Sequence, residues 1–271
     1  MKQIRIILLL LLFAVTVAGQ TGDVVRYSTK KDVLYIGNNE TDAYRKERCY
    51  LDLYYPLNKT KFPTVVWFHG GGLESFQKEI PLQLQNRGIA VVGVNYRLSP
   101  RAKNPAYTED AAEAVAWVFK HIDQFGGDSS QIYVAGHSAG AYLALMVGMD
   151  KSYLKKHGID ADRIKGLIPI SAQTATHYTI RKERGLDMKV PVIDRYAPLT
   201  LVRANIPPML LITGDRALEL TSRYEENLYL LSLLKDAGNQ KVKIYELPGF
   251  DHGSVMSPAC SLLLEWIKHT K

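Results

Sequence analysis

The fold of this chain is decided by one stretch, Gln131-Ile132-Tyr133-Val134-Ala135-Gly136-His137-Ser138-Ala139-Gly140. Its β-branched and aromatic first half predicts a buried strand, and the apolar run that continues to Val147 predicts a helix. The five residues between them match the pattern G-x-S-x-G, which places a serine on a sharp strand-to-helix turn with its hydroxyl exposed. Gly136 and Gly140 fit because neighbouring chains approach too closely there for a Cβ. We therefore expect Ser138 to be a nucleophile.

Strands and helices alternate around this turn. Strands are predicted over 48–56, 62–68, 88–96, 164–170, 208–213 and 242–247, and helices over 76–87, 107–124, 223–237 and 258–269. The alternation implies βαβ units and an α/β fold with a mainly parallel central sheet flanked by helices. Residues 20–45 are polar and predict an irregular leader. Residues 172–205 lack periodicity and predict a small cap-like insertion over the active site.

Length and composition indicate one globular domain over residues 20–271. The chain has 271 residues, of which 46% are hydrophobic and 23% charged, so it can bury a sizeable core. Residues 1–19 have the form of a secretory signal peptide, with Lys2 and Arg5 before an apolar run and small residues near the expected cut. An uncleaved membrane anchor is the alternative. We expect export to the periplasm or the medium, without stable membrane insertion after the signal is removed.

Charge and cysteine content narrow the class of protein further. Removing residues 1–19 lowers the formal net charge from +7 to +5, and no dense Lys/Arg stripe of the kind that binds nucleic acid is present. The two cysteines, Cys49 and Cys260, could form a disulfide in an exported chain or remain as buried thiols. Neither has the spacing of a zinc ligand. We expect no metal, no cofactor and no nucleic-acid partner.

A serine nucleophile needs a base, a group that orients the base, and donors for the oxyanion. His252 is the best of seven histidines, because it follows the last predicted strand in a loop that faces the turn at Ser138. The acid should follow the strand over 208–213, where Asp215 is the first choice and Glu219 the second. His69-Gly70-Gly71-Gly72 matches the H-G-G-G oxyanion motif, so the expected donors are the N–H groups of Gly71, Gly72 and Ala139.

With these motifs the chain resembles the α/β-hydrolase superfamily. Within it, the chain is similar to the small H-G-G-G carboxylesterases, which include hormone-sensitive-lipase-like and bacterial feruloyl-esterase-like enzymes. The resemblance runs through 67–72, 94–100, 110–118 and 136–140 and ends in the loops at 214–215 and 251–253. Asn95-Tyr96-Arg97 favours the feruloyl-esterase-like branch. The resemblance implies hydrolysis of carboxylic esters without a cofactor.

One position departs from the pattern of that family. Its members usually carry the acid in the loop after the last strand but one, three residues after the glycine of that loop. The glycine here is Gly214, so the position is Ala217. Either Asp215 or Glu219 replaces it, or the triad lacks its third member. The leading hypothesis is an exported serine carboxylesterase with a Ser-His-Asp triad, acting on acyl or acetyl groups of carbohydrate. The alternatives are a catalytically weak binding protein on the same scaffold and a serine peptidase.

Overall fold

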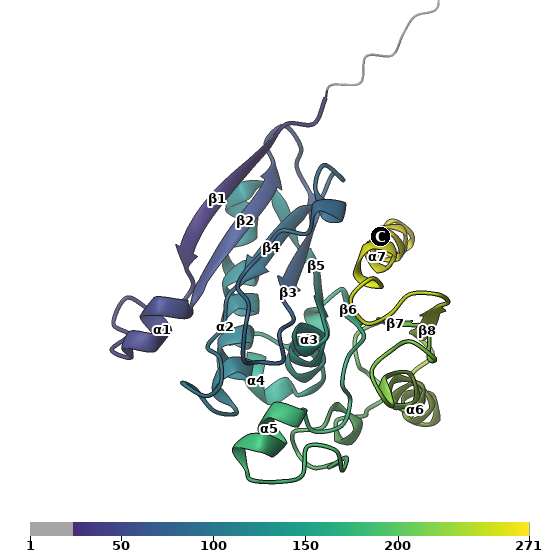
Figure 1. The fold of residues 1–271 in the computed structure, drawn as a ribbon. Helices are drawn as coiled ribbons and strands as arrows, with labels where there is room; N and C mark the ends of the chain where they lie inside the picture. The colour runs from purple at the N-terminus through teal and green to yellow at the C-terminus, as the bar shows by residue number, and fades with distance from the viewer. Residues whose placement is uncertain (1–23, 271) are drawn as a thin grey trace, which may run out of the picture.

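The computed structural model describes residues 24–270, which form an α/β-hydrolase fold around one eight-stranded sheet (Figure 1). The strands lie in the order β1-β2-β4-β3-β5-β6-β7-β8. Both pairings of β2, with β1 and with β4, are antiparallel, and all the others are parallel. The predicted fold class is therefore confirmed. The predicted signal peptide, residues 1–19, lies outside the described residues.

Most predicted elements are present with shifted ends. The strands are β1 (Tyr27–Leu34), β2 (Tyr50–Pro56), β3 (Phe62–Phe68), β4 (Ala90–Val94), β5 (Gly127–His137), β6 (Gly166–Ile170), β7 (Met209–Gly214) and β8 (Val242–Leu247). The α-helices are α1 (Ala43–Arg48), α2 (Ala106–His121), α3 (Ala139–Met149), α4 (Lys151–Lys155), α5 (Tyr178–Glu183), α6 (Arg223–Asp236) and α7 (Met256–His269). Short 3-10 turns are η1 (Leu82–Leu84), η2 (Ile122–Phe125), η3 (Ala161–Arg163) and η4 (Pro198–Thr200).

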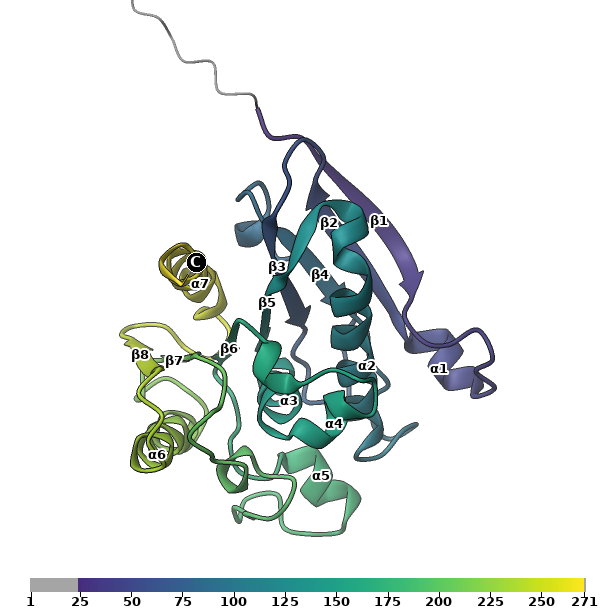
Figure 2. The same ribbon diagram turned by 180° about the vertical axis from the view of Figure 1, so that it is seen from behind.

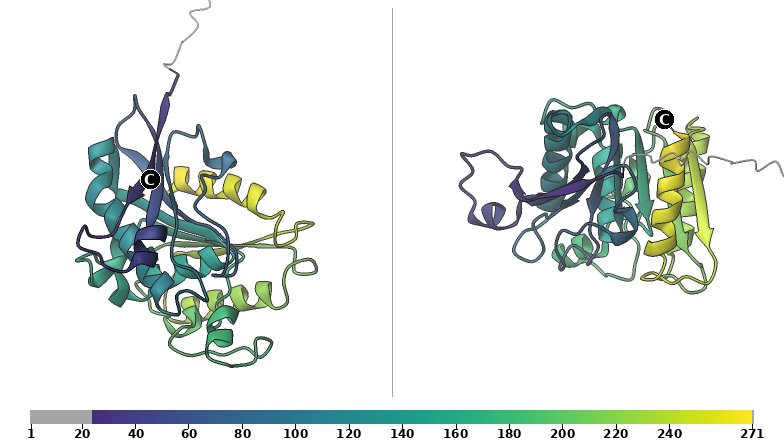
Figure 3. Two further views of the ribbon diagram at one scale, coloured as in Figure 1. Left: turned by 60° about the vertical axis from the view of Figure 1, so that its left-hand side comes forward. Right: turned by 90° about the horizontal axis from the view of Figure 1, so that it is seen from above.

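Helices cover both faces of the sheet and divide the core into two. Helices α2, α3 and α6 pack on one face, with the larger cluster of buried side chains (Figure 2). On the other face lies α7, with η1 near it (Figure 3). Strand β3 serves both clusters, because Val66 and Phe68 point to the first and Val65 and Trp67 to the second. Because both faces of β3 are buried, its sequence is a continuous apolar run.

Two expectations about local structure are wrong. The leader over 20–45 is not irregular throughout, since β1 pairs with β2 at the edge of the sheet and α1 follows. The segment 76–87 is not a helix and contains only the turn η1. The Lys78 N–H donates to Asn95 Oδ1 at 2.5 Å instead of to a helical carbonyl, and Pro81 has no N–H to give. Tertiary hydrogen bonds therefore replace the helical ones in this segment.

The two cysteines are free and buried on opposite faces of the sheet. Cys49 belongs to the cluster under α2 and α3, and Cys260 lies in α7 within the other cluster. The sheet separates the two thiols. The two cysteines are therefore buried free thiols and do not form a disulfide. Among residues 24–270, no helix has both the length and the apolar character needed to cross a membrane.

Candidate active site

Ser138 stands on the turn between β5 and α3 in a strained backbone conformation. Its φ is 55° and its ψ is −116°, a region that residues with a Cβ rarely occupy. The turn is held in place because the Ser138 N–H donates to Ile170 O at 2.9 Å and the Ser138 carbonyl accepts from Tyr142 N at 3.0 Å. The strain therefore projects the hydroxyl out of the carboxyl edge of the sheet.

The glycines of the turn are required by close packing. A Cβ on Gly136 would lie 2.6 Å from the backbone of Gly140, and a Cβ on Gly140 would lie 2.0 Å from Phe68 O. Both distances are far below a normal carbon contact. The sequence pattern G-x-S-x-G thus reflects the close approach of α3 to the end of β3, as predicted.

The structure brings Ser138 and His252 together. His252 Nε2 lies 2.9 Å from Ser138 Oγ, and His252 Nδ1 lies 2.9 Å from Glu219 Oε2. An ionised carboxylate can only accept, so Nδ1 donates to Glu219 and Nε2 is left to accept from the serine hydroxyl. This is the arrangement of nucleophile, base and orienting acid that activates a serine.

The acid against His252 is Glu219, which corrects the preference for Asp215. Asp215 instead accepts from Gly249 N at 2.8 Å and from Ala217 N at 2.9 Å, so it stabilises the turn. The chain makes one helical turn after β7, in which the Glu219 N–H donates to Asp215 O at 2.8 Å. This turn brings residue 219 back over the end of the strand. The longer side chain of glutamate then reaches the imidazole.

The carboxylate of Glu219 is buried, and both of its oxygens accept hydrogen bonds. Its side chain is 1% exposed, and besides His252 it accepts from Gly214 N at 3.1 Å and from Ser171 Oγ. Burial alone would raise the pKa of Glu219, but the hydrogen bonds from His252, Ser171 and Gly214 outweigh it and lower this pKa to about 2. Glu219 is therefore ionised at neutral pH.

His137 supports the loop that carries His252. Its Nε2 lies 2.7 Å from the His252 carbonyl, and the two rings are 4.8 Å apart. Burial lowers the pKa of His137 to about 4, so the ring is neutral and donates Nε2–H to that carbonyl. The sequence gives no indication of this contact beyond the position of His137 next to the nucleophile.

The H-G-G-G loop passes directly over the turn at Ser138. A Cβ on Gly70 would lie 3.5 Å from the Cβ of Ser138. Gly71 and Gly72 have φ values of 93° and 64°, which favour glycine. Tyr96 fixes the start of the loop, since its hydroxyl donates to His69 O at 2.8 Å and its ring stacks on the imidazole of His69.

The insertion contributes Tyr178, which sequence reasoning missed. A Cβ on Gly72 would lie 1.9 Å from the Tyr178 hydroxyl oxygen, so the tyrosine occupies the space beside that glycine. The neighbouring Thr179 hydroxyl donates to the Gly72 carbonyl. Helix α5 therefore lies against the glycine loop. Within residues 24–270 no group of three or more His, Cys, Asp and Glu side chains is placed to hold a metal ion.

Comparisons with known proteins give the family of this chain and several similar esterases. The family model described as BD-FAE matches residues 51–198, which is more than half of the chain. The chain is 27% identical to Esterase LipC of Mycobacterium tuberculosis over 210 residues, which cover 70% of this chain and 51% of LipC. It is 36% identical over 99 residues to a probable isoprenylcysteine alpha-carbonyl methylesterase, ICMEL1, of Arabidopsis thaliana, covering 35% of this chain and 21% of that protein. The chain thus spans about half the length, or less, of these curated relatives.

Solved structures share the fold over nearly the whole chain. A truncated carbohydrate esterase from gut microbiota superposes with a TM-score of 0.75 at 18% identity, covering 92% of this chain and 97% of that one. A hyperthermophilic esterase from the archaeon Pyrobaculum calidifontis gives 0.69 at 25% identity, covering 90% and 85%. At 18% identity the first likeness establishes the fold alone.

Proposed function

Since the chain belongs to the BD-FAE family, we propose that it is a serine carboxylesterase that works through Ser138, His252 and Glu219. One observation carries the proposal. A buried, ionised carboxylate, an imidazole and a serine hydroxyl are joined by two hydrogen bonds of 2.9 Å. Relatives named as esterases support the same reaction class. The Ser-His-Asp triad expected from the sequence becomes Ser-His-Glu.

In the first half of the reaction, Ser138 Oγ attacks the ester carbonyl carbon. His252 Nε2 takes the hydroxyl proton, and Glu219 stabilises the imidazolium that forms. The carbonyl electron pair moves to the oxygen and creates an oxyanion. When the pair returns, the bond to the alcohol oxygen breaks and His252 gives its proton to the leaving alcohol. In the second half water attacks the acyl-enzyme in the same way and releases the carboxylic acid.

The oxyanion needs donors that are in place before it forms. We assign this role to the N–H groups of Gly71, Gly72 and Ala139. The support is the course of the glycine loop over Ser138 and the position of Ala139 at the start of α3. One such donor stabilises the transition state by roughly 2.7–4 kcal/mol.

The observation that suggested a catalytically weak binding protein no longer applies. This observation was the absence of an acid at Ala217, and Glu219 supplies a carboxylate to His252 at 2.9 Å. Among the contacts of residues 24–270, none favours a serine peptidase. The motifs shared with feruloyl-esterase-like enzymes support a carbohydrate as the alcohol half of the ester, and we propose this substrate class.

The test is hydrolysis of p-nitrophenyl acetate, butyrate and ferulate by the protein beside Ser138→Ala. We expect turnover by the wild type and a loss of at least about 10³-fold in kcat for the variant. Ser261→Ala, an exposed serine on α7, is the matched control and should keep full activity. If the wild type hydrolyses none of these esters, or if Ser138→Ala stays active, the proposal is refuted.

We also propose that residues 1–19 direct export and are removed, which would place the mature chain in the periplasm or the medium. The support is the composition of that segment, with two basic residues before an apolar run. Sequencing the N-terminus of the chain recovered from the host of origin tests it. A chain that stays in the cytoplasm with Met1 in place would contradict it.

A further inference from the structure

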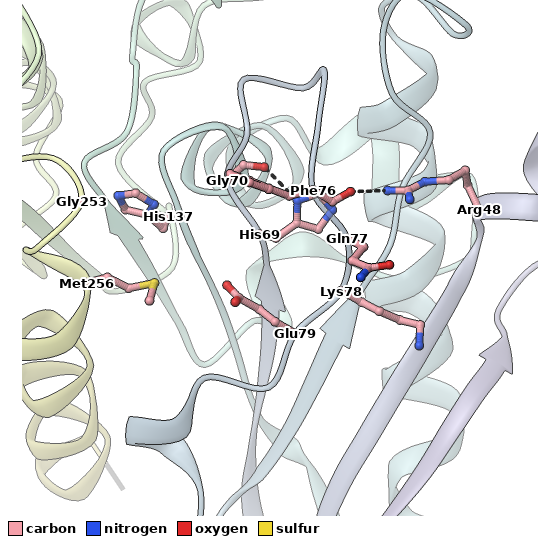
Figure 4. A pocket seen from close by; sticks show the side chains of 10 residues that line it. All are labelled: Arg48, His69, Gly70, Phe76, Gln77, Lys78, Glu79, His137, Gly253 and Met256. Carbon is pink, nitrogen blue, oxygen red and sulfur yellow. Dashed lines mark hydrogen bonds between the residues drawn. The ribbon is translucent and has the colours of Figure 1, made fainter.

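A cavity of about 700 Å³ lies beside the turn at Ser138 (Figure 4). On one side it is lined by His137, which precedes the serine, and by Gly253, which follows His252. On the other side lies the segment 76–79. The volume is that of a small-molecule site, and the cavity borders residues next to both reacting groups.

The wall formed by residues 76–79 is fixed to the rest of the fold at both ends. At its start, Arg48 Nη2 donates to the Phe76 carbonyl at 3.1 Å. At its end, a Cβ on Gly93 in β4 would lie 2.2 Å from the Glu79 carbonyl oxygen, so only glycine allows this approach. The cavity is therefore formed without a ligand.

The lining contains one unpaired charge of each sign. Of the charged side chains that line the cavity, only Lys78 forms ion pairs in the described part of the chain. Its ammonium nitrogen lies 2.7 Å from Asp32 Oδ1 and 2.6 Å from Asp52 Oδ1. The cation of Arg48 and the anion of Glu79 remain without an ionic partner and are not paired with each other. Such a lining is complementary to a ligand that carries both charges.

The two histidines of the lining add no charge to this balance. Burial lowers the pKa of His69 to about 4, and burial likewise lowers the pKa of His137 to about 4. Both rings are therefore neutral at neutral pH. The charge that a ligand meets in the cavity comes from Arg48 and Glu79.

Arg48 forms the cationic end of the cavity. Its Nε donates to Tyr96 O at 3.1 Å and its Nη2 donates to Phe76 O at 3.1 Å. These two carbonyls fix the guanidinium in place, and within residues 24–270 its Nη1 makes no hydrogen bond. A guanidinium with a fixed position and an unmatched charge is suited to a carboxylate.

Glu79 forms the anionic end of the cavity. Trp67 Nε1 donates to Glu79 Oε1 at 3.2 Å, which leaves Glu79 Oε2 without a partner among the described residues. In Figure 4 the carboxylate of Glu79 points to the side of the cavity where His137 and Met256 lie, and Arg48 stands at the opposite end. Glu79 therefore faces the reacting side of the cavity, and Arg48 faces the far side.

We propose that this cavity binds the acyl half of the ester and that this half is an α-amino acid with a carboxylate in its side chain. The inference rests on the proposed function and names its acyl group. The α-ammonium group, next to the ester carbonyl, pairs with Glu79, and the side-chain carboxylate, further along the chain, pairs with Arg48. The acyl half is assigned because an alcohol half that is an uncharged sugar would leave both charges unpaired.

The test uses four methyl esters with the same five-carbon acyl skeleton and different charges. The 1-methyl ester of L-glutamic acid is a zwitterion, the methyl ester of L-2-aminopentanoic acid is a cation, monomethyl glutarate is an anion, and methyl pentanoate is neutral. A pH-stat follows hydrolysis at about pH 6.5, where an α-amino group is mostly protonated. We expect kcat/KM for the zwitterion to exceed that for methyl pentanoate by about tenfold or more. This gain should decline as the pH rises through the pKa of the amino group.

Variants of the two charged residues separate their contributions. Glu79→Gln should lower the preference for the cationic ester over methyl pentanoate by about three- to tenfold, mainly through KM. Arg48→Gln should lower the preference for the zwitterion over the cationic ester by about the same factor, and Arg48→Lys, which keeps the charge, should retain part of it. Glu265→Gln and Arg87→Gln, both exposed and outside the cavity, are the matched controls and should keep both preferences.

The outcomes distinguish a failure of this inference from a failure of the proposed function. If p-nitrophenyl acetate is not hydrolysed, both fail. If it is hydrolysed but the zwitterion is no better than methyl pentanoate, or no better than the better of the two singly charged esters, the function stands and the amino-acid assignment is overturned. If the zwitterion is preferred but Glu79→Gln and Arg48→Gln keep that preference, the acyl group binds elsewhere and the cavity is not its site. Thermal unfolding of each variant verifies that it is folded.

Discussion

At the scale of single residues, the candidate active site depends on the length of one side chain and on the absence of a Cβ at Gly72. Asp215 and Glu219 belong to the same turn, yet only the glutamate lies 2.9 Å from His252. Gly72 has no Cβ, and the Tyr178 hydroxyl uses that space. Both features follow from contacts between segments that are distant in the sequence. Each can be tested against a neighbour of the same type.

The first prediction separates the two candidate acids. Glu219→Gln should lower kcat by roughly 10²–10⁴-fold, because the imidazolium loses its counterion and the ring its orientation. Asp215→Asn should lower kcat by about threefold at most, because its contacts are to Gly249 and Ala217. Steady-state kinetics with p-nitrophenyl acetate measures both. A larger loss in Asp215→Asn than in Glu219→Gln would reverse the assignment.

The second prediction concerns stability in acid. The pKa of folded Glu219 is about 2, below its usual value of 4.5, so its ionised form stabilises the fold above pH 4.5. This stability is lost as the pH falls from 4.5 toward 2. The full shift corresponds to about 3 kcal/mol, of which about 2 kcal/mol disappears between pH 6 and pH 3.

Urea unfolding of the wild type and of Glu219→Gln at these two pH values measures the effect. The free energy of unfolding of the variant should fall by about 2 kcal/mol less than that of the wild type. Equal losses in the two proteins would show that the folded-state pKa of Glu219 is not lowered.

The third prediction uses two glycines with nearly the same backbone. Gly72 and Gly185 have φ values of 64° and 67°, but only a Cβ at Gly72 would meet another atom, the Tyr178 hydroxyl oxygen at 1.9 Å. Gly72→Ala should lower kcat by about tenfold or more, because either the Tyr178 ring or the loop with the proposed oxyanion donors must move. Gly185→Ala carries the same strain and should keep its activity. Similar kcat values in the two variants would mean that the Tyr178 contact does not matter.

At the scale of elements, an ion pair connects α2 to the loop that supports the glycines. Asp110 in α2 is fully buried and accepts from Arg97 Nε and Nη2, both at 2.8 Å, and from Arg97 N at 3.0 Å. Arg97 follows Tyr96, whose hydroxyl donates to the His69 carbonyl. The pair therefore fixes the segment on which the start of the H-G-G-G loop rests.

The fourth prediction follows from that burial. Asp110→Ala should lower the free energy of unfolding by about 3–5 kcal/mol, because the largely buried guanidinium of Arg97 loses its buried partner and keeps only Asp42, which is partly exposed. Glu109→Ala, next to it, removes an exposed pair with Lys156 and should cost about 0.5 kcal/mol or less. Chemical denaturation measures both. A loss below about 1 kcal/mol in Asp110→Ala would mean that this pair does not hold the loop.

At the scale of the whole molecule, the sheet is a barrier between two cores. Cys49 and Cys260 lie on opposite sides of it and are both fully buried. Burial raises the pKa of each thiol to about 12, so both are unreactive thiols in the folded protein.

The fifth prediction is that reductant leaves the melting temperature unchanged. A thiol reagent should label two thiols per chain only after unfolding, since neither is accessible in the native state. Mass spectrometry of the protein alkylated in denaturant counts them. A chain that takes up no label until it is reduced would contain a disulfide and contradict the structure.

The sequence by itself determined the features that depend on local pattern. Continuous apolar runs specified β3 and β5, and the spacing of glycines around Ser138 specified the turn between β5 and α3. These patterns are local, because a buried strand must be apolar and a tight turn must omit a Cβ. The fold class and the positions of Ser138 and His252 at the same edge of the sheet follow from them.

Only the tertiary structure decided which groups meet across the chain. The choice of Glu219 over Asp215 depends on a turn whose direction is set by packing against the loop at Gly249. The segment 76–79 has a helical pattern but is held in a non-helical conformation by contacts with Arg48, Asn95 and Gly93. In both cases a hydrogen bond to a distant segment outweighs a local preference of a few tenths of a kcal/mol per residue. Such partners are distant in sequence, and no local pattern records them.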